Sequence, residues 1–252
     1  MFDDLSQVKR RYEELAYRMT TPEAMNDPAA YAAMMREYKE LTPLVEAYRS
    51  YTALQKEVGL PVKPDVPLMV MVTRLAGHKG LDLLCYIARR LIWEEDAQLL
   101  ILGTGEAQYE SFFRDLSNQF PDQVSAQITF NLGLAARIYA GGDVYLMPSK
   151  SEPCGLSQMN AMRYGTVPVV NATGGLRDTV TPYDPTTGAG RGFTFQSYNA
   201  DDFLASIDRA LALYYDAPEQ FAALAQQDML VDSSWTLPAK EYMQLYQSVC
   251  GG

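Results

Sequence analysis

Two cations stand out as residues able to do chemistry, because they directly follow a short apolar run. Arg74 and Lys79 lie five residues apart in "TRLAGHKG", immediately after "LMVMV". Such a pair can hold a diphosphate, and Gly77 and Gly80 permit a close approach of the backbone. Taken alone, the segment is equally well explained as a solvated loop.

A carboxylate follows a second apolar run, "DVYLMPS". In "EPCGLSQ" we expect Gly155 to open a helix, so that the amides of Gly155, Leu156 and Ser157 face a cleft. Free amides at a helix start favour an anion. Glu152 lies just before them, and an ionised carboxylate only accepts hydrogen bonds, which suits sugar hydroxyls.

A third group of residues follows "TVPVV", where Thr173, Gly174 and Gly175 lie at the mouth of another expected helix. Two helix starts and two cations around one cleft indicate a multiply charged phosphate ligand carrying a hydroxylated group. Phe130 is expected to end the run "SAQITF" at the edge of this cleft. It is either a core phenylalanine or a face on which a nucleobase stacks.

These residues need a common scaffold, and the pattern from residue 58 to 252 predicts one. Short apolar runs alternate with helix-length segments, namely "LMVMV", "QLLILG", "VSAQITF", "DVYLMPS" and "TVPVVN". This alternation is typical of an α/β fold with a Rossmann-like parallel sheet and helices on both faces. Ligands of such sheets bind beyond the carboxyl ends of the strands.

Residues 1–57 follow a different pattern, with apolar residues at alternating steps of three and four. The two stripes are Leu5, Val8, Tyr12, Leu15 and Met19, then Tyr31, Met34, Tyr38, Leu41, Val45 and Tyr48. They predict an antiparallel helical hairpin. Pro22 and Pro28 should confine the turn, Asp27 should cap the second helix, Pro43 should kink it, and Gly59 should end it.

Composition excludes several classes of function. The net charge of −10 over 252 residues argues against a nucleic-acid partner. One histidine, His78, and three widely spaced cysteines, Cys85, Cys154 and Cys250, suggest neither a metal site nor a disulfide framework. No run is long enough to span a membrane, and the charged start does not match a signal peptide, so we expect a cytoplasmic protein without a cofactor.

In motif order and number, residues 52 to 248 resemble the C-terminal domain of bacterial glycogen synthases and plant-type starch synthases. The matching segments are "ALQKEVGLPV", "TRLAGHKGLDLL", "LLILGTGEAQYE", "RIYAGGDVYLMPS", "EPCGLSQ", "RYGTVPVV", "TGGLRDTV" and "SSWTLPAKEYMQLY". That family has the GT-B fold and transfers glucose from ADP-glucose to a glucan with retention. The resemblance implies that Arg74 and Lys79 bind the diphosphate and stabilise the leaving group, while Glu152 grips the glucose.

The resemblance also assigns the remaining residues. Cys154 and Gly155 would line the sugar pocket, Leu156 and Ser157 would lie at the phosphate and ribose, and Phe130 stands where the family places an aromatic ring on adenine. By position, the glycine turn at residues 173 to 175 belongs to the same nucleotide-sugar site. ADP-glucose or ADP is therefore the expected ligand.

Three positions depart from the family pattern. Ser151 replaces a usual phenylalanine, Ala136 replaces a common histidine, and Asn160 holds the second position of an acidic motif seen in related transferases. The first two changes should loosen the support of the pocket. The third removes a second carboxylate, so no paired-carboxylate mechanism is expected.

The first 51 residues resemble the N-terminal helical hairpin of a bacterial class I peptide chain release factor and not a glycogen synthase. The release factor's GGQ tripeptide is absent, so only the hairpin carries over. We expect a fusion-like chain that holds the donor half of a transferase and needs an acceptor domain from elsewhere to reach a glucan. An interaction scaffold without catalysis, a UDP-sugar donor and self-association through the hairpin stay open.

Overall fold

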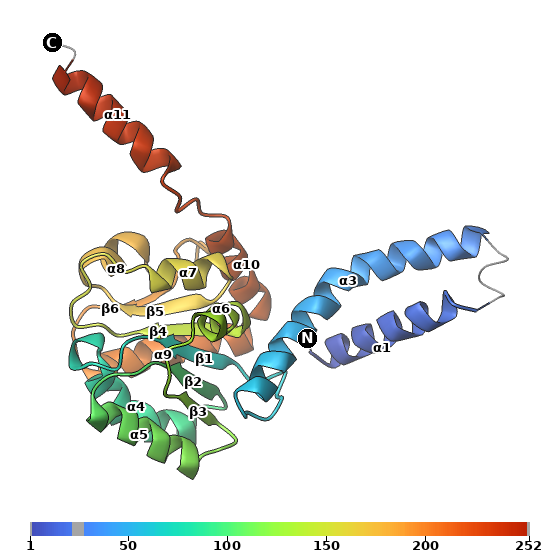
Figure 1. Cartoon of the computed structure of the whole chain (residues 1–252), viewed down its shortest axis with the longest axis horizontal. Coiled ribbons are helices and arrows are strands. Elements are labelled where there is room, and N and C mark those ends of the chain that lie inside the picture. The colour runs from blue at the N-terminus through green and yellow to red at the C-terminus, as the bar shows by residue number, and fades with distance from the viewer. Residues whose placement is uncertain (1, 22–27, 251–252) are drawn as a thin grey trace.

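A computed structural model describes residues 2–21 and 28–250. Its centre is a six-stranded sheet with the order β3-β2-β1-β4-β5-β6, in which every neighbouring pair is parallel (Figure 1). The strands are β1 (Leu68–Val72), β2 (Gln98–Leu102), β3 (Val124–Gln127), β4 (Val144–Met147), β5 (Val167–Asn171) and β6 (Phe193–Phe195). The predicted Rossmann-like sheet is confirmed, and the strand order reverses between β1 and β4, where ligands bind in such folds.

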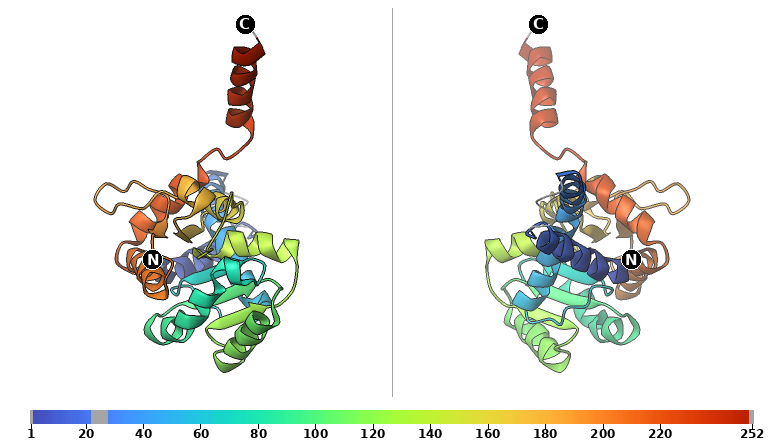
Figure 2. Two further views of the ribbon diagram at one scale, coloured as in Figure 1. Left: turned by 90° about the vertical axis from the view of Figure 1, so that its left-hand side faces the viewer. Right: turned by 90° about the vertical axis from the view of Figure 1, so that its right-hand side faces the viewer.

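Helices cover both faces of this sheet, as predicted. One face carries α4 (Leu81–Glu94), α5 (Ala107–Gln119), α9 (Ala200–Asp216) and α10 (Pro218–Met229). The other face carries the end of α3 (Pro28–Glu57), α6 (Leu132–Gly141), α7 (Ser157–Arg163) and α8 (Gly174–Thr179). The chain ends in α11 (Thr236–Cys250), which extends away from the sheet in every view (Figures 1 and 2).

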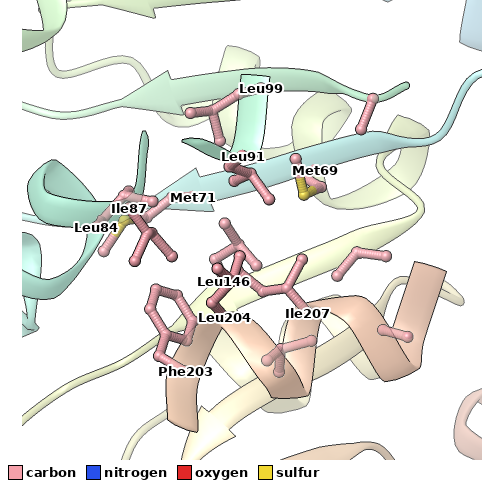
Figure 3. Packing of buried hydrophobic residues seen from close by; sticks show 14 of the residues in the cluster. Met69, Met71, Leu84, Ile87, Leu91, Leu99, Leu146, Phe203, Leu204 and Ile207 are labelled. Carbon is pink, nitrogen blue, oxygen red and sulfur yellow. The ribbon is translucent and has the colours of Figure 1, made fainter. Parts of the chain in front are cut away.

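The strands alternate their side chains between the two faces. Met69 and Met71 of β1 pack with α4 and α9, whereas Leu68 and Val70 of the same strand face α6. Figure 3 shows the first of these layers, where β1, β2 and β4 meet α4 and α9. Because both faces are buried, the strands read as continuous apolar runs, which is why they could be recognised in the sequence.

Two details of the strands differ from the prediction. β3 ends at Gln127, so Phe130 does not end a strand but lies in the loop before α6. The run "ITF" leaves the sheet because β2, its only neighbour, ends at Leu102, paired with Gln127. β6 was not predicted, since its three residues are too few to show a periodic pattern.

The predicted helical hairpin is present, formed by α1 (Phe2–Arg18) and α3. Tyr12 and Tyr38 stack with ring centroids 4.2 Å apart, and Leu15 is fully buried. Arg11 donates two hydrogen bonds to the Glu37 carboxylate, at 2.7 and 3.0 Å. The apolar stripe is thus the packed face of the two helices.

The ends of the long helix follow the sequence signals in part. α3 begins at Pro28 and ends two residues before Gly59, whose φ of 81° accompanies the hydrogen bond from Leu60 N–H to Gln55 C=O. At Pro43 the helix continues without interruption, so the proline does not break it. Asp27, predicted to cap α3, and Pro22 lie outside the described residues.

The last two turns of α3 belong to the packing of the α/β domain. Leu54 is buried there, and a Cβ at Gly141 of α6 would lie 2.7 Å from its side chain. Gln55 donates a buried hydrogen bond to Gln98 at the start of β2, at 2.8 Å. No helix in the described part of the chain is long and apolar enough to cross a membrane.

Candidate functional site

The loops after β1 and β4 lie against each other and bring two predicted site residues together. Gly80 closes the 3₁₀ turn η1 (Gly77–Lys79) with a φ of 77°, and a Cβ there would lie 2.0 Å from the Pro148 carbonyl oxygen. The amide of Lys150 also donates to the His78 carbonyl, at 2.9 Å. Only glycine permits this approach, which carries Lys79 toward the loop that follows β4.

Lys79 and Glu152 form an ion pair across these loops. The Lys79 Nζ lies 2.6 Å from Glu152 Oε2, and the side chains are only 19% and 13% exposed. Ser149 donates to the same carboxylate oxygen at 3.2 Å. Lys79, the residue predicted to bind phosphate, and Glu152, the residue predicted to bind the sugar, are thus direct partners in the structure, although 73 residues separate them.

The start of α8 supports the same loop from the β5 side. The amide of Gly175 donates to the Glu152 carbonyl at 3.0 Å, and a Cβ at Gly175 would lie 2.0 Å from the Cys154 carbonyl oxygen. Gly174 has a φ of 46°, and Thr173 occupies the N-cap position in an extended conformation. The amide of Gly175 therefore holds the loop, although we expected it to face a ligand.

The predicted helix start after Gly155 is present, and this glycine adopts a left-handed conformation. Gly155 has a φ of 72° and is buried, while the side chains of Cys154 and Leu156 are exposed. The Ser157 hydroxyl contacts the Met147 sulfur at 3.4 Å. Within the described part of the chain, the amides of residues 155 to 157 donate no hydrogen bond, which leaves these donors available to a ligand.

Lys79, Glu152 and the loops around Gly155 and Gly175 form a polar cluster. A cleft of about 760 Å³ opens beside this polar cluster, at the carboxyl ends of β1, β2 and β3. Arg74 and Phe130 line it, and the Phe130 ring is 80% exposed. Arg74 forms no salt bridge with any residue that the structure describes. The cleft thus combines a free cation with an apolar face, as a nucleotide site requires.

Two of the three departures from the family pattern lie in the wall of this cleft. Ala136 on α6 and Asn160 on α7 both line it, together with Tyr139 and Tyr164, which the sequence analysis did not identify. Ala136 contributes only a methyl group to this wall. The tyrosines could not be singled out because helical spacing alone also explains them as packing residues.

The loops after β1 and β2 contact each other at the edge of the cleft, which both of them line. A Cβ at Gly103 would lie 1.8 Å from the Thr73 carbonyl oxygen, so this glycine is needed for the close contact of the loops. Glu106 accepts a hydrogen bond from the Gly77 amide at 3.0 Å, which lowers the pKa of that carboxyl. The turn carrying Lys79 is thereby tied to the helix after β2.

The predicted site residues therefore fall into two groups. Lys79, Glu152 and the loops around Gly155 and Gly175 form a polar cluster, whereas Arg74 and Phe130 line the neighbouring cleft. Among the described residues, no three His, Cys, Asp or Glu side chains gather as a metal site would require. The arrangement suits an anion with an apolar group on one side and hydroxyls on the other.

Comparison with known families agrees with this geometry. The model of the family described as "Glycosyl transferases group 1" matches residues 52–228, which include both groups of site residues. The chain belongs to this family. The match begins inside α3, in agreement with the packing of Leu54 against the α/β domain.

The most similar proteins include bacterial glycogen synthases. The chain is 48% identical over 228 residues to the glycogen synthase of Exiguobacterium sibiricum and 47% identical over 225 residues to that of Bacillus licheniformis. These matches cover 84% and 88% of this chain, but only 47% and 45% of the relatives. These matches cover a larger share of the chain than the residues after Tyr51 make up. The similarity to glycogen synthases therefore extends into the hairpin, whereas we expected it to begin only after Tyr51.

Solved structures show the same relationship. The catalytic domain of starch synthase IV from Arabidopsis thaliana, bound to ADP and acarbose, is 33% identical with a TM-score of 0.73. The match covers 80% of this chain and 42% of that one. A sucrose-phosphate synthase from Thermosynechococcus elongatus, 24% identical with a TM-score of 0.59 over 79% of this chain and 48% of that one, shares the fold.

Proposed function

We propose that this chain is the donor-binding half of a glycogen or starch synthase-type glycosyltransferase. Its ligand would be ADP-glucose, the donor for retaining α-1,4-glucosyl transfer to a glucan. The observation that carries the proposal is the Lys79–Glu152 pair at the carboxyl edge of the sheet, beside a cleft that holds Arg74 and Phe130. Similarity to glycogen synthases at 47–48% identity supports the same assignment.

Each group of residues has a distinct role in the proposal. Arg74 and Lys79 bind the diphosphate and stabilise the charge that develops as it leaves, since cations held in place before the reaction are effective at this. Glu152 accepts hydrogen bonds from the glucose hydroxyls, next to Cys154 and Gly155. The amides at Leu156 and Ser157, and the turn at residues 173 to 175, border the phosphates and the ribose.

The nucleobase would occupy the apolar cleft, against the exposed ring of Phe130. The starch synthase IV neighbour holds ADP, which favours adenine over uracil for this chain as well. A UDP-sugar is the competing ligand. Titration with both nucleotides separates the two, because the phosphate contacts are common and only the base contact differs.

Transfer by this chain alone should be undetectable or very slow. A GT-B enzyme works between two domains, and the chain spans less than half of its glycogen synthase relatives. Holding donor and acceptor in register is worth about 7–11 kcal/mol of barrier, which one wall of a cleft does not supply. Slow hydrolysis of ADP-glucose is the expected residual activity, because water enters an open site.

The hairpin is proposed to act outside the donor site. Within the described part of the chain, no residue of α1 lines the cleft. Removal of residues 1 to 51 should therefore leave ADP affinity unchanged, since Leu54 and the last turn of α3 are retained. A large loss of affinity would show that the hairpin supports the site.

The test is incorporation of radiolabelled glucose from ADP-glucose into glycogen, with and without a separately expressed glycogen synthase N-terminal domain. We expect no incorporation by the chain alone and measurable incorporation when the second domain is added. Glu152→Ala should abolish that activity, whereas Glu219→Ala, an exposed carboxylate on α10, should not. Robust incorporation by the chain alone would contradict the proposal that these 252 residues supply only the donor side of the reaction.

A further inference from the structure

The two oxygens of the Glu152 carboxylate are used differently. Oε2 receives both the Lys79 ammonium at 2.6 Å and the Ser149 hydroxyl at 3.2 Å. Within the described part of the chain, Oε1 accepts no hydrogen bond from any side chain or amide. One oxygen is therefore anchored and the other is available to a ligand.

Ser149 is itself rigidly held. The residue is 1% exposed, and its carbonyl accepts a hydrogen bond from the Asn171 side chain at the end of β5, at 2.9 Å. The Glu152 carbonyl is held in turn by the Gly175 amide. Both ends of the short segment from Ser149 to Glu152 are thus fixed, to β5 and to α8. The Ser149 hydroxyl therefore donates to Glu152 from a fixed position.

Lys79 and Ser149 differ in what a bound nucleotide would do to them. A diphosphate would attract the Lys79 ammonium group, because opposite charges attract strongly in a partly buried site. That competition weakens the hold of Lys79 on Glu152. The Ser149 hydroxyl is neutral and enclosed, so it keeps its bond to Oε2 when the phosphates arrive.

We propose that Ser149 is a positioning residue that holds Glu152 for the sugar while Lys79 engages the diphosphate. The inference rests on the proposed function, because it takes Glu152 as the contact to glucose. A local turn does not account for the bond, since the hydroxyl donates to the Glu152 side chain and not to a backbone group. Its effect should therefore depend on the sugar and not on the nucleotide.

The experiment is calorimetric titration of the full chain with ADP and with ADP-glucose. Ser149→Ala should weaken ADP-glucose about 5- to 10-fold, the effect of losing one ordering hydrogen bond, and leave ADP affinity unchanged. Ser149→Cys, whose thiol fills the site but donates only weakly, should act in the same direction without leaving a cavity. Ser206→Ala, equally buried on α9, removes a hydroxyl remote from the site and should alter neither affinity.

A double-mutant cycle separates positioning from general support. On a Glu152→Gln background, Ser149→Ala should have a smaller effect on ADP-glucose, because the carboxylate that it positions is gone. Equal loss of ADP and ADP-glucose affinity, or no loss of either, would overturn the inference while leaving the proposed function intact. Equal wild-type affinity for the two ligands would also overturn it, and failure to bind either would overturn both proposals.

Discussion

The two sides of the site are built in opposite ways. The polar cluster around Glu152 is closely packed, with contacts from the ends of β1, β4 and β5 that only glycine allows at Gly80 and Gly175. The neighbouring cleft is open, and its most prominent side chain, Phe130, is 80% exposed. Fixed geometry thus surrounds the proposed phosphate and sugar, while the proposed base meets an adaptable surface.

This difference separates two requirements of a nucleotide-sugar site. Charge at a leaving group is stabilised best by groups that do not reorganise, so the polar cluster needs a rigid frame. A nucleobase is held mainly by apolar contact, which tolerates a less precise wall. Substitutions on the two sides should therefore differ in what they damage.

Gly175→Ala should give the largest effect. Its Cβ would lie 2.0 Å from a carbonyl oxygen of the Glu152 loop, so the loop must shift, and we expect a loss of about 3 kcal/mol in stability together with ADP binding. Gly133→Ala, at the first turn of α6 beside the cleft, has its nearest neighbour at 3.5 Å and should be neutral. Urea unfolding of both variants measures this difference. Equal changes in stability for Gly175→Ala and Gly133→Ala would contradict the distinction between the two sides.

The stability of the fold should depend on pH through one buried carboxyl group. Asp228, in α10 which packs on α7, is 2% exposed, and burial raises its pKa to about 7 despite the Arg191 partner at 3.4 Å. The folded state therefore holds this proton more tightly than the unfolded state, and its contribution to stability declines as pH rises toward 7. The expected loss between pH 5 and pH 8 is about 2–3 kcal/mol.

Asp228→Asn isolates this contribution, because it keeps the shape and removes the titration. Urea unfolding at pH 5 and pH 8 should show a smaller loss of stability on raising the pH in the variant than in the wild type. Identical pH dependence in the two proteins would show that Asp228 does not titrate in this range. ADP binding at pH 7 should be nearly unchanged, since Asp228 does not line the cleft.

The cations of the site should contribute to affinity and not to stability. Arg74→Ala and Lys79→Ala should each weaken ADP binding by about 1.5–3 kcal/mol, the value of a charge-assisted hydrogen bond. Arg114→Ala on α5 and Lys240→Ala on α11 remove the same charges from exposed positions elsewhere. Wild-type affinity in both Arg74→Ala and Lys79→Ala would refute the phosphate assignment.

The smallest effect should come from the exposed aromatic ring in the open cleft. Phe130→Ala should weaken ADP by about 1 kcal/mol through the lost aromatic contact, without change in stability, because the ring is exposed. Tyr86→Ala on α4 removes an aromatic ring of similar exposure, 78%, and serves as the control. Competition titrations suffice for both, and an effect of Phe130→Ala larger than that of Lys79→Ala would reverse the comparison.

The sequence predicted the structure best at positions where the residue type has a single physical explanation. Buried parallel strands appear as apolar runs, and glycines at Gly80, Gly155 and Gly175 mark positions where other side chains are strained or excluded by close neighbours. The positions of Lys79 and Glu152 after two strands indicated a shared edge. Their direct contact could not be predicted, because it depends on the approach of the loops that carry them.

The less predictable features depend on tertiary contacts. Phe130 was expected at a strand end, but the length of β3 is set by its partner β2. Ser149 gave no signal, since a serine after a strand is common and its bond to Glu152 depends on the fold of the loop. The cleft tyrosines, Tyr139 on α6 and Tyr164 just after α7, are explained equally well by the sequence as packing residues.

The central claim is that this chain binds an adenine nucleotide sugar in one site, formed by the polar cluster and the neighbouring cleft. Calorimetric titration of the wild-type chain with ADP-glucose, ADP and UDP-glucose tests it most directly. We predict one binding site for ADP-glucose and for ADP, with UDP-glucose weaker than ADP-glucose. Absence of binding by all three ligands would contradict the claim, and tighter binding of UDP-glucose would assign the site to a different donor.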